Sequence, residues 1–213
     1  AINHFLTAPY SFMNYTRTMP KSHGVFCLEA DWFGLVRPMS MRPALDLMES
    51  SDARIPYVLR DVVTRAEIEF YLRRSFQARY RRFDLLWFAI HSRPGELLPG
   101  DMRVPLERIS LDDLEEMLAG RCRGRILHFS GCRFLKIPTA RLTKFMKRTK
   151  ALCVSGFSRE VPWLESTIFE TYWLTLLHYE SRSRMGAKRA VTLMRREQKP
   201  LCKKFGFVMR VQE

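Results

Sequence analysis

Residues 85–92, Leu-Leu-Trp-Phe-Ala-Ile-His-Ser, form an apolar run that ends in an imidazole, and residues 126–133, Ile-Leu-His-Phe-Ser-Gly-Cys-Arg, form a second run that ends in a thiol. Strands of a parallel sheet that is buried on both faces read as continuous apolar runs. Open α/β sheets bind their ligands beyond the carboxyl ends of the strands. We therefore expect His91 and Cys132 to meet in one crevice, with a thiol nucleophile beside its base.

Further apolar runs alternate with helical patterns along the chain. Thr64 followed by Glu67 is a capping box that opens a helix to about Arg82, and Ser110 caps a helix that continues to Gly120. Other helices are expected at residues 42–50, 139–150 and 161–179, and strands near residues 24–30, 56–62, 85–91, 125–130 and 151–156. This alternation predicts a three-layer α/β/α fold with a mostly parallel sheet.

The domain organisation follows from composition. Residues 1–22 read as an N-terminal extension, residues 23–180 as the α/β domain, and residues 181–213 as a basic C-terminal segment packed on the same domain. That segment has apolar residues at helical spacing up to about Lys204, and Phe205–Val211 is expected to be a last strand. Residues 95–109 are expected to form a loop with a small hairpin, and the long 161–179 helix to be well buried.

The net charge of +14 lies in the second half of the chain. Residues 1–120 hold 15 Lys and Arg against 16 Asp and Glu, whereas residues 121–213 hold 21 against 6. This asymmetry indicates a negatively charged partner, although a solvated basic face or an acidic second subunit would also account for it. We expect a regulatory or acidic protein partner at the tail, with nucleic acid as the weaker candidate, because no aromatic residues are interleaved there for base stacking. The tail cations are Lys188, Arg189, Arg195, Arg196, Lys199, Lys203 and Lys204.

Cysteine usage favours a reducing, cytoplasmic location. Five cysteines without a Cys-x-x-Cys pair argue against a disulfide framework, a zinc site or a redox pair, so no metal or cofactor is expected. Cys27 and Cys153 lie inside apolar runs and are expected to be buried. No apolar run approaches the ~18 residues of a membrane span, and no secretory signal is evident, so no membrane contact is expected.

The two motifs resemble the caspase-like cysteine peptidases, the superfamily of caspases, metacaspases, legumain, separase and CHAT-type proteases. In these enzymes one apolar block ends in His-Gly and a second ends in a small residue and Cys. Here the blocks end in His91-Ser92 and Gly131-Cys132, and Cys132 follows His91 by 41 positions. Ser92 replaces the usual Gly and the caspase Gln-Ala pair is absent, which argues against the caspase subgroup itself. The resemblance in order of elements covers Gly24 to Tyr179.

A second resemblance is to an uncharacterised bacterial family with this architecture, through residues 26–32 and 161–166. Together the resemblances imply a caspase-like sheet and a cysteine endopeptidase with a His91–Cys132 dyad, acting on a protein or peptide substrate. We expect a regulated bacterial effector in defence or signalling, because an unrestrained cytosolic protease would harm the cell.

Several residues near the expected strand ends complete the hypothesis. Amides around Ser92, Gly131 and Cys132 would supply the oxyanion hole. Arg93, Arg133 and Arg159 would receive an acidic substrate group, or Asp31, Asp61 and Glu165 a basic one; each can equally be a solvated surface residue. His128 is interpreted as a core histidine rather than a rival base.

Two alternatives remain. The first is a non-catalytic caspase-like module whose basic half docks on an acidic protein or on nucleic acid. The second is a flavodoxin-like nucleotide or phosphate binder. The sequence has no Gly-x-Gly-x-x-Gly or Walker loop, which argues against this alternative.

Overall fold

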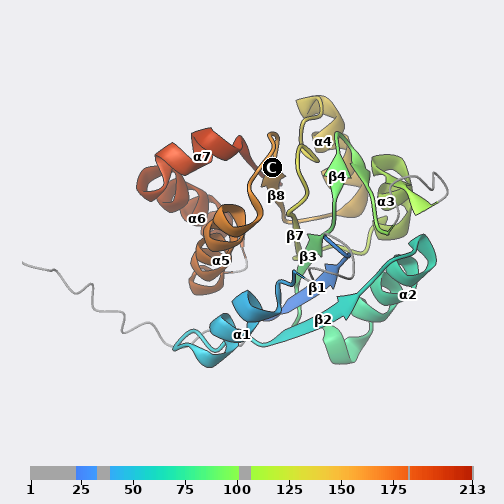
Figure 1. Cartoon of the computed structure of the whole chain (residues 1–213), viewed down its shortest axis with the longest axis horizontal. Helices are drawn as coiled ribbons and strands as arrows, with labels where there is room; N and C mark the ends of the chain where they lie inside the picture. Colours follow the sequence, from blue (N-terminus) through green and yellow to red (C-terminus); the bar gives the residue numbers. More distant parts are fainter. Residues whose placement is uncertain (1–22, 33–38, 101–106, 182, 213) are drawn as a thin grey trace, which may run out of the picture.

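The protein is built around one six-stranded sheet (Figure 1). The computed structural model describes residues 23–32, 39–100, 107–181 and 183–212, so the expected N-terminal extension lies outside the described residues. The strand order is β2-β1-β3-β7-β8-β9, with every neighbouring pair parallel except β8 and β9. The strands are β1 (Val25–Glu29), β2 (Tyr57–Asp61), β3 (Leu85–Ala89), β7 (Ile126–Phe129), β8 (Cys153–Phe157) and β9 (Phe207–Val211). The expected α/β fold with a mostly parallel sheet is confirmed.

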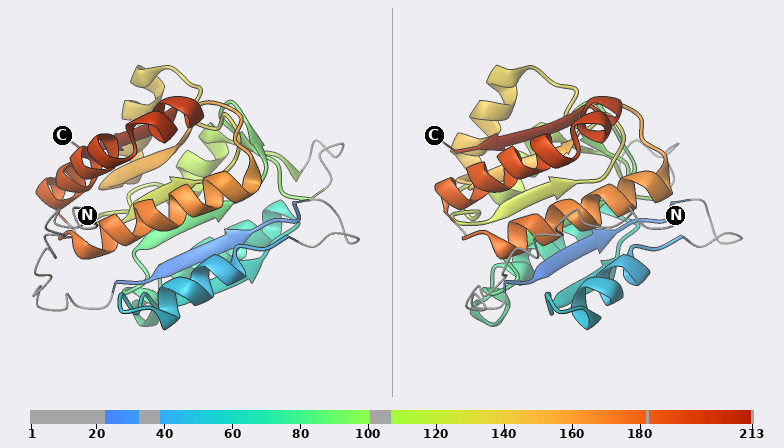
Figure 2. Two further views of the ribbon diagram at one scale, coloured as in Figure 1. Left: turned by 60° about the vertical axis from the view of Figure 1, so that its left-hand side comes forward. Right: turned by 90° about the vertical axis from the view of Figure 1, so that its left-hand side faces the viewer.

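Helices cover both faces of the sheet, which gives the three expected layers (Figure 2). One face packs against α2 (Arg65–Ser75), α3 (Leu111–Leu118) and α4 (Thr139–Thr149). The other face packs against α1 (Arg42–Ser50), α5 (Trp163–Tyr179), α6 (Arg184–Glu197) and α7 (Lys199–Phe205).

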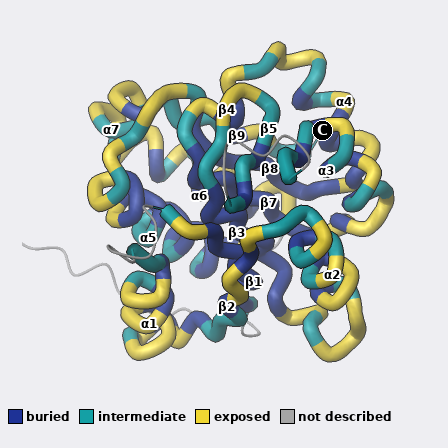
Figure 3. Tube along the Cα trace, turned by 45° about the vertical axis from the view of Figure 1, so that its right-hand side comes forward, coloured by how far each residue is buried: buried dark blue, intermediate teal, exposed yellow. Residues whose placement is uncertain are grey.

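The central strands are buried on both faces, which explains why their sequences are continuously apolar (Figure 3). In β3, Leu86 and Phe88 enter the core on the α2 side, whereas Leu85 and Trp87 enter the core on the α5 side. Because side chains alternate across a strand, each face must be apolar when both are covered. Cys27 and Cys153 are buried in the second of these cores, as predicted.

Helix α2 is shorter than expected. Its predicted capping box is present, since Thr64 accepts from the Glu67 amide and Glu67 accepts from the Thr64 amide. The prediction of a helix to about Arg82 was wrong: α2 ends at Ser75, and a short 3-10 turn, η1, follows at Ala78–Tyr80. The carbonyl of Ser75 accepts a hydrogen bond of 2.9 Å from the buried Arg125 guanidinium. This bond from a distant segment satisfies the helix end, which no local pattern could reveal.

The basic C-terminal segment divides into two helices and an edge strand. Helix α6 ends at Glu197, and α7 begins with Pro200 as its second residue, a position where proline is tolerated. Gly206, with φ 58°, ends α7 in the left-handed conformation, and β9 then pairs with β8 in antiparallel register. The segment thereby completes the sheet and adds α6 beside α5.

A small antiparallel sheet follows β3 directly. It consists of β4 (Ser92–Arg93), β5 (Glu96–Leu97) and β6 (Ile109–Ser110), consistent with the expected hairpin. Residues 101–106 of that expected loop lie outside the described residues. The Leu98 amide donates to the His91 carbonyl at 2.7 Å, so the hairpin holds the backbone of His91. Within the described ranges, no helix is long and apolar enough to cross a membrane.

Candidate active site

His91 and Cys132 line the same pocket, of about 110 Å³, at the carboxyl edge of the sheet. Strands β3 and β7 are parallel neighbours in the register Phe88 to Phe129, so their carboxyl ends lie side by side. Residues after β1, β3 and β7 and the first turns of α5 surround the pocket. Its lining is Trp32, Met41, His91, Ser130, Cys132, Val161, Trp163, Ser166, Thr167 and Glu170.

The turn after β7 lies against the turn after β3 because residue 131 is a glycine. A Cβ atom at Gly131 would lie 2.1 Å from Ser92 Oγ and 2.5 Å from the Ile90 carbonyl oxygen. Ser92 Oγ donates to the Cys132 carbonyl at 2.9 Å and ties the two turns together. The serine that departs from the caspase-like His-Gly pattern thus positions the cysteine.

The imidazole of His91 is oriented by the chain after β1. His91 Nε2 lies 2.6 Å from the Trp32 carbonyl oxygen, and the two rings meet edge to face with centroids 4.9 Å apart. A carbonyl oxygen can only accept, so Nε2 carries the proton, and the lone pair of the neutral ring belongs to Nδ1. With Nε2 engaged in this way, the basic lone pair of the neutral ring is the one on Nδ1.

The thiol of Cys132 contacts the segment that leads into α5. Its Sγ accepts from the Val161 amide at 3.4 Å and lies 3.8 Å from the Val161 carbonyl oxygen. Cys132 is half-buried, whereas Cys27, Cys122 and Cys153 are fully buried. An amide that donates to sulfur stabilises negative charge on it, which is what a thiolate nucleophile requires.

The other accessible thiol differs in its surroundings. Cys202 is half-buried on α7, and burial raises its pKa. Burial also raises the pKa of Cys27 well above its ordinary range and that of Cys122 to about 12. All five cysteines are free thiols.

A buried polar network closes the floor of the pocket. His128 bonds to Ser155 Oγ at 2.8 Å through Nδ1 and to Glu170 Oε1 at 2.9 Å through Nε2, and Trp173 donates to the same serine. The interpretation of His128 as a core histidine with satisfied hydrogen bonds is confirmed. Sequence reasoning missed Glu170, although an acid in the middle of an apolar helix is a signal that could have found it.

Glu29, at the end of β1, is a second residue that sequence reasoning missed. Its carboxylate accepts from the Met41 amide at 2.6 Å, from Ser40 Oγ at 2.6 Å and from Trp32 Nε1 at 3.2 Å. Burial raises the pKa of Glu29, and these three hydrogen bonds act in the opposite direction. Glu29 thereby holds both Trp32 and Met41, which line the pocket.

The predicted substrate-binding residues are not among those that line this pocket. Arg93 pairs with Glu96 at 2.6 Å, Arg133 pairs with Glu160, and Arg159 donates to the Lys203 carbonyl at 3.1 Å. Glu165 pairs with Lys204. Asp31 follows β1 and Asp61 is the last residue of β2, and both are exposed. A role for any of them in substrate binding stays a prediction.

An apolar groove continues from the pocket between α1 and α5. The groove, of about 570 Å³, shares Trp163 and Thr167 with the pocket. Leu47, Leu164 and Ile168 line it and are 62%, 64% and 63% exposed. The expectation that the 161–179 helix is well buried was therefore wrong for its first turns, which turn large apolar side chains to solvent.

Three cations of the basic tail form ion pairs, two of them with acids that precede the tail. Arg189 pairs with Glu180 at 2.7 Å, Arg196 pairs with Glu197 at 2.7 Å, and Lys204 pairs with Glu165. Arg195, Lys199 and Lys203 are exposed. Across the residues that can be described, no three His, Cys, Asp or Glu side chains gather so as to hold a metal ion.

Comparison of the chain with known proteins identifies its family but indicates no biochemical activity. No curated protein matches the chain. Residues 22–210 match a family described as a family of unknown function, DUF6642, and this match covers both motifs and all of the sheet except its last residue, Val211. The chain therefore belongs to the DUF6642 family.

Proposed function

We propose that this protein is a cysteine endopeptidase in which Cys132 is the nucleophile and His91 is its base. One observation carries the proposal: the two side chains line one pocket at the carboxyl ends of adjacent parallel strands. Ligands of open α/β sheets bind at this edge, and a nucleophile beside an oriented base is the arrangement of covalent catalysis.

The chemistry would proceed in two steps. Nδ1 of His91 takes the thiol proton while Sγ attacks the carbonyl carbon of the scissile bond. The same proton then passes to the leaving amine, which leaves a thioester on Cys132. Water attacks this thioester, again with His91 as base, and releases the acid and the free thiol. Amides near Ser92, Gly131 and Cys132 would stabilise the oxyanion in both steps.

The groove between α1 and α5 suits an extended peptide. Its wall of Leu47, Leu164 and Ile168 is apolar and begins where the catalytic pocket ends. We therefore propose substrates with large apolar side chains near the scissile bond. The free thiols fit the reducing cytoplasm in which a regulated effector would act.

Reaction with a thiol-directed electrophile tests the dyad without knowledge of the substrate or of an activating partner. The full chain is treated with iodoacetamide, and each cysteine is followed by peptide mass spectrometry. Cys132 should be alkylated faster than Cys202, and His91→Ala should slow alkylation at Cys132 only. Equal rates at Cys132 and Cys202, together with no effect of His91→Ala, would contradict the proposal.

Activity is then measured with a fluorogenic peptide library. Cys132→Ala and His91→Ala should each remove nearly all turnover, because the two residues act as a unit. Cys202→Ala is the matched control and should retain full turnover.

A non-catalytic docking module remains the second candidate, and the exposed Arg195, Lys199 and Lys203 on α6 and α7 favour it. On this reading an acidic protein binds the tail. Replacing Arg195, Arg196, Lys203 and Lys204 by Glu should then abolish partner binding and leave the reactivity of Cys132 unchanged.

A further inference from the structure

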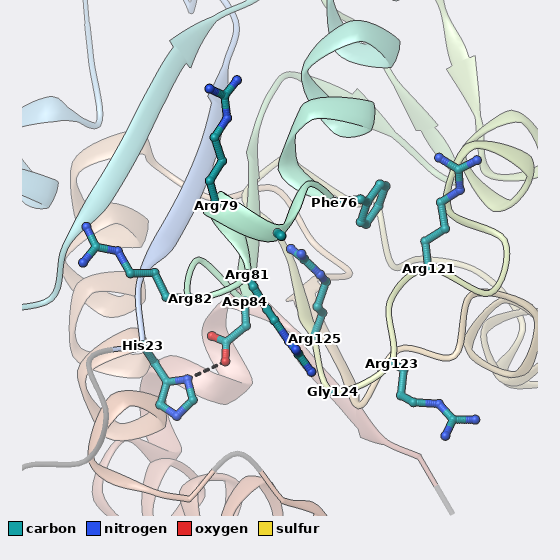
Figure 4. A pocket seen from close by; sticks show the side chains of 11 residues that line it. His23, Phe76, Arg79, Arg81, Arg82, Asp84, Arg121, Arg123, Gly124 and Arg125 are labelled. Atoms are coloured by element: carbon teal, nitrogen blue, oxygen red, sulfur yellow. Dashed lines mark hydrogen bonds and ion pairs between the residues drawn. The ribbon is translucent and has the colours of Figure 1, made fainter.

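A cluster of arginines lies at the amino ends of the strands, whereas Cys132 lies at their carboxyl ends. Six arginines line a pocket of about 1030 Å³ near the amino ends of β1, β3 and β7 (Figure 4). Arg79, Arg81 and Arg82 come from the segment after α2, and Arg121, Arg123 and Arg125 come from the segment before β7. The pocket shares no residue with the candidate active site.

A smaller pocket of about 160 Å³ adjoins the first and shares Arg79 with it. It lies between α2 and the edge of the sheet, and its lining includes Arg60 and Arg74 together with Phe70, Tyr71 and Tyr80. The two pockets meet at Arg79, and we call their combined lining the arginine face.

Arginines alternate with aromatic rings along this face. The guanidinium carbon of Arg74 lies 5.1 Å from the Phe70 ring centroid, and that of Arg79 lies 4.9 Å from the Tyr80 centroid. Arg82 lies over Phe83, at 4.9 Å from its centroid, but that ring is buried and lines neither pocket. The Phe76 ring has two guanidinium neighbours, Arg121 at 5.7 Å and Arg125 at 5.1 Å. Guanidinium groups held over aromatic rings lose less freedom when they bind a ligand than free side chains do.

The positive charge of the face is not neutralised locally. Among the described residues, none of its eight arginines forms an ion pair with a carboxylate. Asp84 lies in the larger pocket and is paired with His23 at 2.5 Å (Figure 4). The larger pocket thus holds six arginines against one carboxylate, and a concave surface with such an excess of one sign of charge attracts a ligand of opposite charge.

Arg125 joins the segments that build the face. It is buried, and its guanidinium donates to the carbonyl oxygens of Phe83 at 3.1 Å and Ser75 at 2.9 Å. Both acceptors are neutral carbonyl groups, and the two bonds hold the two segments in place. The face is therefore a preformed surface, since its base is anchored in the core.

We propose that the arginine face binds single-stranded nucleic acid. Phosphates would contact the exposed arginines, and bases would stack on the rings and guanidinium planes between them. The face extends over two adjoining pockets, which fits several successive nucleotides better than one compact phosphate compound. Unpaired bases are needed for stacking, so a duplex should bind more weakly.

Fluorescence anisotropy with labelled 20-nucleotide RNA and DNA strands tests the proposal on the full chain. Changing Arg79, Arg82, Arg121 and Arg123 to Gln should weaken binding at least tenfold. The slope of log K against log salt should become shallower by about 0.7 for each phosphate that the variant no longer neutralises. The control variant changes Lys188, Arg195, Lys199 and Lys203 to Gln, so it loses the same amount of positive charge from α6 and α7. Its affinity should stay within about threefold of the wild type, as expected for cations that touch no phosphate.

Stacking is tested separately with Phe70→Ala, which should weaken strand binding about tenfold and leave the affinity for inorganic tripolyphosphate unchanged. The comparison of RNA with DNA shows which strand is preferred. Equal losses in the two charge variants, equal affinity for duplex DNA, or displacement of the strand by stoichiometric tripolyphosphate would each overturn the proposal. Thermal unfolding of every variant confirms that it is folded.

Discussion

Ser92 Oγ donates a 2.9 Å hydrogen bond to the carbonyl oxygen of Cys132, forty residues further along the chain. The bond joins the turn that follows β3 to the turn that follows β7, and Gly131 makes the approach possible. The positions of the His91 and Cys132 backbones therefore depend on each other. A substitution in either turn should therefore displace the backbones of both His91 and Cys132.

Gly131→Ala should destabilise the protein, because the new methyl group would overlap Ser92 Oγ and the Ile90 carbonyl oxygen. Overpacking of this kind costs about 1–3 kcal/mol. Urea unfolding followed by circular dichroism measures the loss. Gly120→Ala gives the cost of backbone strain alone for comparison, since its φ is 70° and its Cβ would meet no atom within 4 Å. A loss below about 1 kcal/mol in Gly131→Ala would show that the two turns can move apart.

Glu170→Leu should also destabilise the fold, because it leaves the buried His128 without its partner at 2.9 Å. An unsatisfied buried polar group costs about 1–3 kcal/mol. Glu170→Gln keeps an oxygen that can accept from His128 and should recover most of that loss. Chemical unfolding compares the two variants, and equal stabilities would argue against a hydrogen-bonded role for the carboxylate.

Asp113 should make stability depend on pH in the acidic range. Hydrogen bonds from Arg65 at 2.7 Å and from Ser110 lower the pKa of Asp113 to about 2. Since the folded pKa lies below the unfolded one, the contribution is complete above about pH 4 and is lost as the pH falls towards 2.

Asp113→Asn should therefore cost about 1–2 kcal/mol at pH 7, after allowance for solvent screening, and little near pH 2. Unfolding at several pH values measures the difference. Asp112→Asn is the control, because Asp112 is exposed and pairs with Arg141 at the surface. A loss at Asp113 that does not change with pH would exclude the ion pair as its cause.

Arg189→Gln should destabilise the attachment of α6, since Arg189 pairs at 2.7 Å with Glu180, a buried carboxylate at the end of α5. Because the Arg189 side chain is half exposed, solvent screens the pair and the loss should be about 0.5–1 kcal/mol. Lys188→Gln changes an exposed neighbour and should have little effect. Hydrogen exchange of α6 amides would report the loosening, and unchanged exchange in Arg189→Gln would contradict it.

Much of the fold could be predicted from local pattern. The continuous apolar runs at β3 and β7 indicated strands buried on both faces, and the capping residues Thr64 and Ser110 marked two helix starts. Each signal depends on neighbours within a few residues, whose spacing along the chain is known. For the same reason the strand ends suggested that His91 and Cys132 share one edge, and they line one pocket there.

Features that join distant segments could not be predicted in this way. Arg125 ends α2 by bonding to Ser75, fifty positions away, and so shortens a helix whose own pattern continues. The charge of the sequence pointed to the tail, because Arg79, Arg81 and Arg82 lie in a first half with balanced charge. Only folding brings them beside Arg121 and Arg123.

The sequence by itself therefore determined the elements, their order and the two residues of the candidate dyad, because apolar periodicity and caps are local properties. Tertiary structure decided which carboxylate closes the pocket, where the apolar groove runs and which arginines form one face. Each of these features needs side chains from separate elements to meet in the folded chain. The contact between Glu170 and His128, for example, joins residues whose separation along the sequence gives no sign that they are neighbours.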